Sequence, residues 1–480
     1  MSGWEVGCYQ VIPFSEMMRR SKARHKNKDE NFSLFTDTVD QIKNNLKIIL
    51  TFVKKTVNLT IMREELLKYR FLNQLLPDSN QRTIVLITGA RQTGKTTIAR
   101  EKYAEMPYYN LDAIEYREGL KTISTFAWGK DIGEAVFDEA QKEPSIFEKI
   151  KYCFDEKNIN FSVLLGSSQI LLIKKIRETL SGRINIYELW PLLLSELFWN
   201  KNSKTVTTPL IQELLETDSI DDHFDKIPSI IMGLEKERRI KIQNYYLNWG
   251  GMPALISLNA NERIKWLKDY EYTYLERDLS DLARLDDLAP FRKFQKLSAL
   301  RSGNLLNYSE IARDASLSVD SSRRYLEYLA LSYQVILLQP YYENLTSSII
   351  KTPKLYWSDI GILRQLSNHW SEYDGRIYET MVVGEIFKTI RTLGMNIECY
   401  FYRTRSGMEL DLLIKNQHGF IGIEIKKRNK VYHSDITVMK KVASALGKRW
   451  LGGIVVYNGD QCKKICDPAI WSIPSYRLFI

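Results

Sequence analysis

One octapeptide has the composition of a phosphate-binding loop. Residues 89–96 read Gly-Ala-Arg-Gln-Thr-Gly-Lys-Thr and satisfy the pattern G-x-x-x-x-G-K-[ST]. In such a loop the glycines let backbone N–H groups wrap the phosphates, the lysine reaches the β- and γ-phosphates and the hydroxyl ligates magnesium. An apolar, β-branched run at 83–88 predicts the buried strand that this motif requires before it, and a helical pattern begins near Lys95. The predicted ATP-binding residues are Gly89, Ala90, Arg91, Gln92, Thr93, Gly94, Lys95, Thr96 and Thr97, with Thr96 also on Mg²⁺.

A second element completes this chemistry. The apolar residues 135–137 run into Asp138 and Glu139, as expected of a strand that ends in a Walker B acid pair. Asp138 is predicted to hold magnesium and Glu139 to polarise the attacking water. Two acids after a strand would be weak support alone, but they lie downstream of a phosphate loop. The sequence therefore predicts ATP hydrolysis.

Two further residues each have two interpretations. Ser168 follows a third strand-like run, where its hydroxyl could contact the γ-phosphate or the water, or could cap a helix. Arg183 could stabilise the transition state, in its own chain or across a subunit interface. A surface salt bridge is the competing explanation for Arg183.

A second cluster of charged residues lies late in the chain. Glu409 and Asp411 alternate with apolar residues, so they share one face of a strand, and so do Glu424 and Lys426. A hairpin would bring Asp411, Glu424 and Lys426 together. Two carboxylates can bind a hard divalent cation, Mg²⁺ or Mn²⁺, and a lysine beside them can orient or activate water for phosphodiester attack. The alternatives are a solvated strand face, or an inherited fold whose site no longer cuts.

Residues 309–329 read as helix, turn, helix. The second helix could enter a DNA major groove, with Arg323 and Arg324 near the phosphates. Such modules also serve as packing units inside ATPases, and the acidic residues Asp314, Asp320 and Glu327 weaken the DNA interpretation.

Composition limits the class of protein. At 480 residues we expect about three domains. The 26% charged and 44% hydrophobic residues are typical of a globular chain and exclude a disordered or fibrous one. A net charge of +10 permits attraction to nucleic acid. Five scattered cysteines indicate a reducing compartment, and the apolar run at 46–53 is too short to cross a bilayer. We therefore expect a cytoplasmic protein that does not associate with membranes.

The elements that must position these residues alternate between strands and helices from residue 83 onward, which favours an α/β sheet with crossovers. We predict a helical and basic extension over residues 1–80, a P-loop ATPase core over 81–225 and a helical lid over 226–290. A winged-helix-like module over 291–350 and a last α/β domain over 351–480 follow.

Several short motifs resemble those of a widespread family of prokaryotic AAA-type ATPases. They are Ser167-Ser168, the runs at 180–183, 189–192 and 250–253, Glu196, and the run Lys-Leu-Tyr-Trp-Ser-Asp-Ile-Gly at 354–361. The resemblance covers the chain from about residue 82 to its C-terminus and leaves the first 80 residues outside. It implies an AAA-type core, a lid, a winged-helix-like unit and a C-terminal domain with a restriction-endonuclease-like core, but no cellular role.

The late charged cluster also resembles the D…ExK core of the restriction-endonuclease-like superfamily, usually written PD-(D/E)XK. Asp411, Glu424 and Lys426 match this core, and Glu385 corresponds to the helix acid often found before it. The proline before Asp411 is missing. The resemblance implies a metal site of Glu385, Asp411 and Glu424, with Lys426 in the chemistry.

Together these features predict an ATP-hydrolysing AAA-type protein that acts on DNA through a metal-dependent nuclease-like domain. The alternative is an ATP-driven switch or scaffold whose nuclease-like fold is silent and binds a protein partner. A homo-oligomer is compatible with both.

Overall fold

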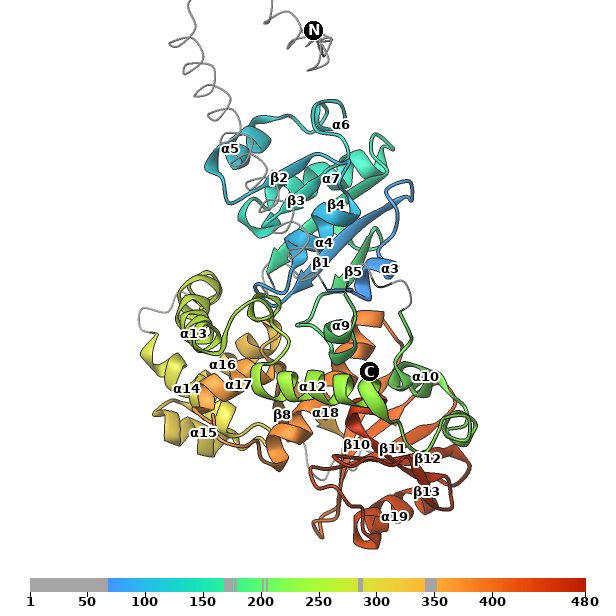
Figure 1. Ribbon diagram of the computed structural model, residues 1–480. Helices are drawn as coiled ribbons and strands as arrows, with labels where there is room; N and C mark the ends of the chain where they lie inside the picture. The colour runs from blue at the N-terminus through green and yellow to red at the C-terminus, as the bar shows by residue number, and fades with distance from the viewer. Residues whose placement is uncertain are drawn as a thin grey trace, which may run out of the picture. The chain divides into compact units, whose positions relative to one another are not determined.

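The computed structural model describes residues 68–167, 176, 179–200, 203, 206–283, 288–341 and 352–480 (Figure 1). Residues 1–67, most of the predicted N-terminal extension, lie outside these ranges. The end of that predicted extension belongs to the first globular part, because Leu72 and Leu76 are buried against its sheet. Helix α3 (Leu72–Leu75) lies in this segment.

The first sheet is parallel and has the strand order β2-β3-β4-β1-β5. Its strands are β1 (Thr83–Gly89), β2 (Tyr108–Asn110), β3 (Val136–Asp138), β4 (Phe161–Ser167) and β5 (Ile184–Glu188). The helices beside it are α4 (Lys95–Lys102), α5 (Ile114–Thr122), α6 (Trp128–Asp131) and α7 (Ser145–Asp155), with a 3₁₀ turn, η1, at Ala140–Lys142.

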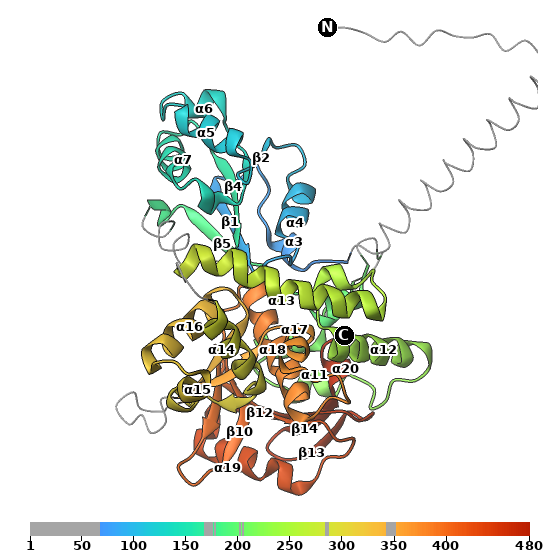
Figure 2. The same ribbon diagram turned by 90° about the vertical axis from the view of Figure 1, so that its left-hand side faces the viewer.

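Both faces of this sheet are covered, as a parallel sheet requires. Alternate residues of β1 pack on opposite faces: Ile84 and Leu86 join the core with α6 and α7, whereas Val85 and Ile87 join the one with α3 and α4. Figure 2 shows α5, α6 and α7 on one side of the strands and α3 and α4 on the other. The predicted α/β core is therefore confirmed for this part of the chain.

A mainly helical region follows. It contains α9 (Leu194–Phe198), α10 (Leu210–Glu216), α11 (Asp221–Phe224), α12 (Gly233–Trp249), η2 (Pro253–Leu255), α13 (Ala260–Ala283) and α14 (Ala289–Leu300). Helices α15 (Tyr308–Ala315) and α16 (Val319–Leu331) form the predicted helix, turn, helix. The side chains of Asn307 and Ser318 cap their first turns, and Ser316 makes the left-handed turn between them.

A second, mixed sheet has the strand order β13-β14-β12-β11-β10-β9-β7-β8-β6. Its strands are β6 (Asn304–Leu305), β7 (Val335–Pro340), β8 (Lys354–Trp357), β9 (Glu398–Arg403), β10 (Glu409–Lys415), β11 (Phe420–Lys426), β12 (Trp450–Tyr457), β13 (Lys463–Cys466) and β14 (Ile470–Pro474). The remaining helices are α17 (Ile360–Ser367), α18 (Gly375–Leu393), α19 (Thr437–Leu446) and α20 (Ser475–Leu478), with 3₁₀ turns η3 (His433–Ile436) and η4 (Gly447–Arg449).

Helices α18 and α19 cover opposite faces of this sheet. Ile423 of β11 joins the core that contains Val382 and Ile386 of α18, and Leu410 of β10 joins the core that contains Met439 of α19. Strand β7 pairs in parallel with β9 and antiparallel with β8. The boundary predicted between residues 350 and 351 therefore falls inside one continuous sheet.

Three of the short family-like motifs meet at one place. Gly251 N donates a hydrogen bond to Asp359 Oδ2 at 2.7 Å, and Leu192 N donates one to the carbonyl of Gly251 at 2.8 Å. A Cβ on Gly251 would lie 2.2 Å from the Leu192 carbonyl oxygen, so a side chain does not fit there. The motifs at 189–192, 250–253 and 354–361 thus form a packing junction.

None of the helices in the described ranges combines the length and the apolar composition that a membrane crossing requires.

Candidate functional site

The phosphate loop joins the buried end of β1 to the start of α4. Gly89 has a φ of 149°, and a Cβ there would lie 2.0 Å from the Leu189 carbonyl oxygen, so the turn requires glycine. The Lys95 ammonium is buried and donates to the carbonyls of Gly89 at 3.0 Å and Ala90 at 2.8 Å. The side chain therefore folds back over its own loop, with its charge where phosphates would be wrapped. Thr97 lies exposed in the first turn of α4.

Thr96 and Asp138 are brought together from segments 42 residues apart. The Thr96 hydroxyl donates to Asp138 Oδ2 at 2.6 Å, and the Tyr108 hydroxyl donates to the same oxygen at 2.5 Å. The other oxygen, Oδ1, accepts from the backbone N–H of Glu139 at 2.9 Å. A hydroxyl and a carboxylate in contact are the donor set that Mg²⁺ prefers. The sequence did not identify Tyr108, because a tyrosine in a short strand carries no motif.

Glu139 stands in a left-handed backbone conformation, with a φ of 54°. Burial raises the pKa of its carboxyl, and a hydrogen bond from Gln141 Nε2 to Oε2, at 2.5 Å, opposes that rise. Asp138 raises the pKa further, whereas Lys95 lowers it. A carboxylate in this environment is suited to accept a proton from water. Gln141 is a second residue that the sequence did not identify.

The structure does not bring Arg183 to the phosphate loop of its own chain. Arg183 precedes β5, and its carbonyl accepts from Ile84 N. It therefore lies at the N-terminal end of the strands, whereas Gly89 lies at their C-terminal end. Its guanidinium forms two hydrogen bonds with the Asp155 carboxylate, at 2.6 and 2.9 Å. This is the salt bridge that competed with the catalytic interpretation. Ser168 lies outside the described residues, although Ser167 is in register with Gly89.

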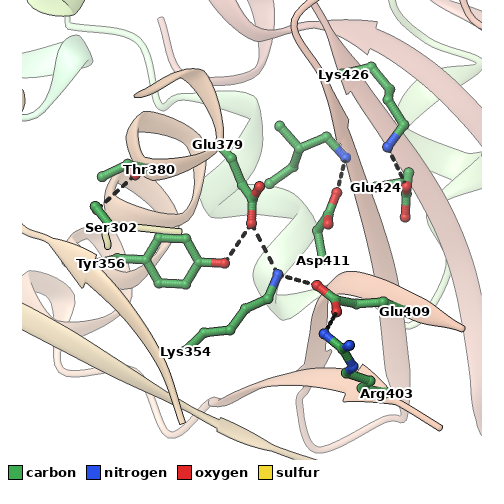
Figure 3. A network of polar contacts seen from close by, with 11 residues as sticks. Ser302, Lys354, Tyr356, Glu379, Thr380, Arg403, Glu409, Asp411, Glu424 and Lys426 are labelled. Carbon is green, nitrogen blue, oxygen red and sulfur yellow. Dashed lines mark hydrogen bonds and ion pairs between the residues drawn. The ribbon is translucent and has the colours of Figure 1, made fainter. Parts of the chain in front are cut away.

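The late charged cluster is built on the predicted hairpin. Strands β10 and β11 are antiparallel, with Leu412 opposite Ile423, and Asp411 and Glu424 are the next residues beyond that pair. Asp411 Oδ2 accepts from Ile425 N at 2.8 Å, and the Lys426 ammonium donates to Glu424 Oε1 at 2.5 Å. The pairing of β10 with β9 shifts register at Asp411, between Leu410 and Leu413. Figure 3 shows Asp411 between the Glu424–Lys426 pair and a second group of charged side chains.

That second group centres on a lysine. The Lys354 ammonium forms ion pairs with the carboxylates of Glu379, at 3.2 Å, and of Glu409. Glu379 also accepts from the Tyr356 hydroxyl at 2.7 Å, and Glu409 pairs with Arg403 at 2.8 Å. The sequence missed Glu379, Lys354 and Tyr356 as site residues. Lys354 and Tyr356 lie in the motif at 354–361, and that motif is the sequence feature that could have identified them.

Glu385 was predicted as the helix acid of this site, but the structure places its carboxylate elsewhere. Its carboxylate accepts from Leu194 N at 2.7 Å and from the Lys388 ammonium at 2.7 Å, so it is satisfied inside the core. Glu379 is the acid of α18 that faces Asp411. The two glutamates are six residues apart, which turns them by about 240° around a helix, so they cannot face the same site.

Burial and like charges dominate the electrostatics of this acidic site. Burial raises the pKa of Asp411 well above its ordinary value, and Glu379 and Glu424 raise it further. Burial likewise raises the pKa of Glu424, against the effect of Lys426. Burial alone would lower the pKa of Lys426, but Asp411 and Glu424 outweigh it and raise the pKa. One oxygen, Glu424 Oε2, is buried and has no hydrogen-bond partner.

Two carboxylates of this site, those of Asp411 and Glu424, are suited to a hard cation. Glu424 is 8% exposed, and its unpaired oxygen lies on the strand beside Asp411. Within the described ranges, no three or more His, Cys, Asp or Glu side chains are gathered closely enough to hold a metal ion. Mg²⁺ is often held by one or two carboxylates together with waters and substrate phosphates. Asp411 and Glu424 could supply those two carboxylates.

Helix α16 carries the two arginines considered for DNA. Arg323 lies over the ring of Tyr308 and 3.6 Å from Asp320, so part of its charge is offset locally. Both Arg323 and Arg324 are exposed.

Comparisons with known proteins divide the chain into three matched segments. Residues 81–198 match the model of an AAA domain. Residues 240–372 and 374–476 match models of two domains of unknown function, DUF8612 and DUF4143.

Similar proteins come from bacteria and archaea. An uncharacterized protein of Mycobacterium tuberculosis is 25% identical over 406 residues, which cover 82% of this chain and 80% of that protein. One of Methanocaldococcus jannaschii is 25% identical over 407 residues, covering 80% and 84%. Among solved structures, a Walker-type ATPase of Pyrococcus abyssi is similar over 62% of this chain and 99% of that chain, with 16% identity and a TM-score of 0.37.

The AAA-domain match contains the first sheet, the phosphate loop and the acid pair. Residues 81–198 are therefore similar to an AAA domain. The α/β fold of this segment, with its parallel sheet, resembles a P-loop ATPase core. The models matched by residues 240–372 and 374–476 name no activity.

Proposed function

We propose that the chain binds ATP with Mg²⁺ at residues 89–97 and hydrolyses it. The observation that carries the proposal is the 2.6 Å contact between Thr96 and Asp138, beside the buried Lys95 ammonium. Thr96 and Asp138 would hold the magnesium ion, which, when bound, neutralises charge on the β- and γ-phosphate oxygens. Lys95 and the N–H groups at the start of α4 bind the phosphates and stabilise the charge that develops on them.

Glu139 is the base in this proposal. Its carboxylate orients water for in-line attack on the γ-phosphorus and accepts the proton of that water as the bond to the leaving oxygen breaks. Gln141 holds the carboxylate through Oε2.

Phosphate release from ATP tests this proposal. Lys95→Ala should lower turnover by about a hundredfold or more, because the phosphates lose their cationic contact. Glu139→Gln should keep nucleotide binding and lose turnover. Lys102→Ala, in the same helix but paired with exposed Asp78, is the matched control and should behave as wild type. Unchanged turnover in Lys95→Ala would refute the site, and a Glu139→Gln variant as fast as wild type would remove Glu139 from the mechanism.

A second function is favoured by the buried, unpaired Oε2 of Glu424 beside Asp411. In this proposal the C-terminal domain is restriction-endonuclease-like and cleaves DNA. Asp411 and Glu424 hold a divalent cation, which supplies charge neutralisation at the scissile phosphate. Lys426 orients the attacking water. Attack forms a new P–O bond while the bond to the leaving sugar oxygen breaks. Helices α15 and α16, as part of a winged-helix-like unit, could contribute phosphate contacts through Arg323 and Arg324.

Cleavage of plasmid and single-stranded DNA, with Mg²⁺ or Mn²⁺ and with or without ATP, tests the second function. Asp411→Ala and Lys426→Ala should both abolish cutting, whereas Lys415→Ala, on the exposed end of β10, should not. ATP dependence would show that the ATPase controls the domain. Absence of cutting under every condition favours the alternative, an ATP-driven switch or scaffold that binds a protein partner. Salt-sensitive DNA binding would then separate DNA from protein as the partner, because phosphate contacts weaken steeply with salt.

A further inference from the structure

Lys354 is a buried cation at the C-terminal acidic site. It lies at the start of β8, its side chain is 4% exposed, and its ammonium is 5.8 Å from the centre of the Phe401 ring. Figure 3 shows its ammonium between Glu379 and Glu409, next to Asp411. Lys354 comes from the segment matched by the model for residues 240–372, whereas the acids come from the segment matched by the model for 374–476. Two matched segments therefore build one site.

The two lysines form ion pairs with different acids of this site. Lys354 pairs with Glu379 and Glu409, which are held further by Tyr356 and Arg403. Lys426 pairs with one oxygen of Glu424 and leaves the other without a partner. Among the oxygens of these acids, Glu424 Oε2 is the buried one that lacks a hydrogen-bond partner, whereas Glu379 binds Lys354 and Tyr356 through its Oε1.

We infer that Lys354 is a positioning residue whose ammonium takes the place of a second metal ion at this site. It keeps Glu379 and Glu409 from acting as metal ligands and confines a divalent cation to Asp411 and Glu424, one ion per chain. The inference rests on the proposed function, in which Asp411 and Glu424 bind such an ion.

The physical reason is the cost of separating a buried pair. A metal ion that took Glu379 or Glu409 would remove one of the two ion-pair partners of the buried Lys354 ammonium, and separating a buried ion pair is unfavourable. The ammonium cannot relax into solvent, because the side chain is almost completely covered. A divalent ion at Asp411 and Glu424 leaves the ion pairs of Lys354 with Glu379 and Glu409 in place.

Mn²⁺ titration of the full chain, followed by calorimetry without nucleotide, tests the inference. All variants carry Asp138→Asn, which removes the acid proposed to hold the other magnesium. The parent should bind one Mn²⁺, and Asp411→Asn should abolish that binding. Lys354→Gln keeps N–H donors for both glutamates but removes the charge. It should bind a second Mn²⁺, or bind the first about tenfold more tightly or better. Lys354→Arg keeps the charge and should resemble the parent.

Glu379→Gln supplies the decisive cross-check. In the parent it should change the Mn²⁺ affinity by less than about threefold, because Lys354 already occupies Glu379. In Lys354→Gln it should reverse the gain, because the freed glutamate is what the additional binding uses. Circular dichroism checks the fold of each variant. If Lys354→Gln does not fold, Glu379→Gln alone still decides, since a loss of binding there would make Glu379 a ligand.

The outcomes separate the inference from the proposed function. Parent binding that does not depend on Asp411, or no binding, would refute the metal site itself. Asp411-dependent binding that is unchanged in Lys354→Gln, or that already involves two ions in the parent, would overturn only the role of Lys354.

Discussion

At the scale of single residues, Glu139 combines a strained backbone with a perturbed carboxyl. Its left-handed conformation, at a φ of 54°, places its N–H on Asp138 and its side chain against Gln141. Non-glycine residues in this conformation cost free energy and persist only where their surroundings fix them. The acid pair of the proposed ATP site is therefore held by contacts on both sides, and the protonation of Glu139 depends on its neighbours.

Removing the Gln141 side chain should shift the acid limb of the pH profile of ATP hydrolysis to higher pH. Burial raises the pKa of Glu139, and the Gln141 N–H, which binds the charged form, lowers it. A base that must be ionised loses activity as pH falls through its pKa. In Gln141→Ala the pKa rises further, so turnover at saturating ATP should begin to fall at a higher pH than in wild type. The pH profile of kcat measures this shift.

Two controls belong to this profile. Lys102→Ala, whose partner Asp78 is not among the groups that shift the pKa of Glu139, should leave the acid limb where wild type has it. Glu139→Gln has no group to titrate, and its residual rate should lack the limb. An acid limb unmoved in Gln141→Ala would mean that another group sets it.

At the scale of elements, the Asp359 carboxylate joins α17 to the junction of the short motifs through hydrogen bonds. It is fully buried, caps α17 by accepting from Ile362 N at 3.0 Å, and accepts from Gly251 N at 2.7 Å. Burial raises the pKa of its carboxyl, and the backbone N–H groups of Gly251 and Ile362 oppose that rise. The charge is thus stabilised by backbone donors from two segments more than a hundred residues apart.

Asp359→Ala should lower the free energy of unfolding by about 2–4 kcal/mol, because two buried N–H groups lose their acceptor. Asp374→Ala is the matched control. Asp374 caps α18 in the same way, through Ile377 N at 2.9 Å, but it is half-buried and joins no second segment by a backbone bond. Its loss should cost about 1 kcal/mol. Urea denaturation measures both, and equal losses would show that the bond to Gly251 contributes nothing.

Local signals and long-range packing account for what the sequence could and could not predict. The strand, phosphate loop and helix around Lys95 are contiguous, so one motif predicts the whole arrangement. The hairpin of Asp411 and Glu424 follows from alternation over neighbouring strands. The resemblance implies Glu385 as the helix acid, but Glu379 lies on the same helix, and only tertiary packing decides which face of that helix meets the hairpin. Lys354 could not be placed, because its strand reaches the site through the nonlocal pairing of β7 with β9.

At the scale of the whole described chain, α18 connects the two sheets. Its N-terminal half carries Glu379 into the acidic site. Its C-terminal half packs Phe387 with Trp190 and Ala90 of the phosphate loop, and Arg391 pairs there with Glu188 at the end of β5. Between them, Glu385 accepts from Leu194 N. One helix therefore contacts both the ATPase core and the C-terminal site.

Two ion pairs of α18, Lys388–Glu385 and Arg391–Glu188, should differ sharply in their effect on stability. Lys388 and Glu385 are 0% and 2% exposed, whereas Arg391 is 51% exposed. Lys388→Met leaves the Glu385 carboxylate buried without its cation, and it should cost about 3–5 kcal/mol of unfolding free energy. Arg391→Met removes a solvent-screened pair and should cost about 1 kcal/mol or less. Denaturant unfolding of both variants measures the difference.

The double variant Lys388→Met/Glu385→Gln separates the two causes of such a loss. Removing the carboxylate charge along with the ammonium leaves no uncompensated charge, and the amide of glutamine still offers an oxygen to Leu194 N. The double variant should therefore recover most of the stability that Lys388→Met loses. If it is as unstable as the single variant, the contacts of the Lys388 ammonium with the hydroxyl and ring of Tyr246, rather than its pairing with Glu385, hold α18 in place.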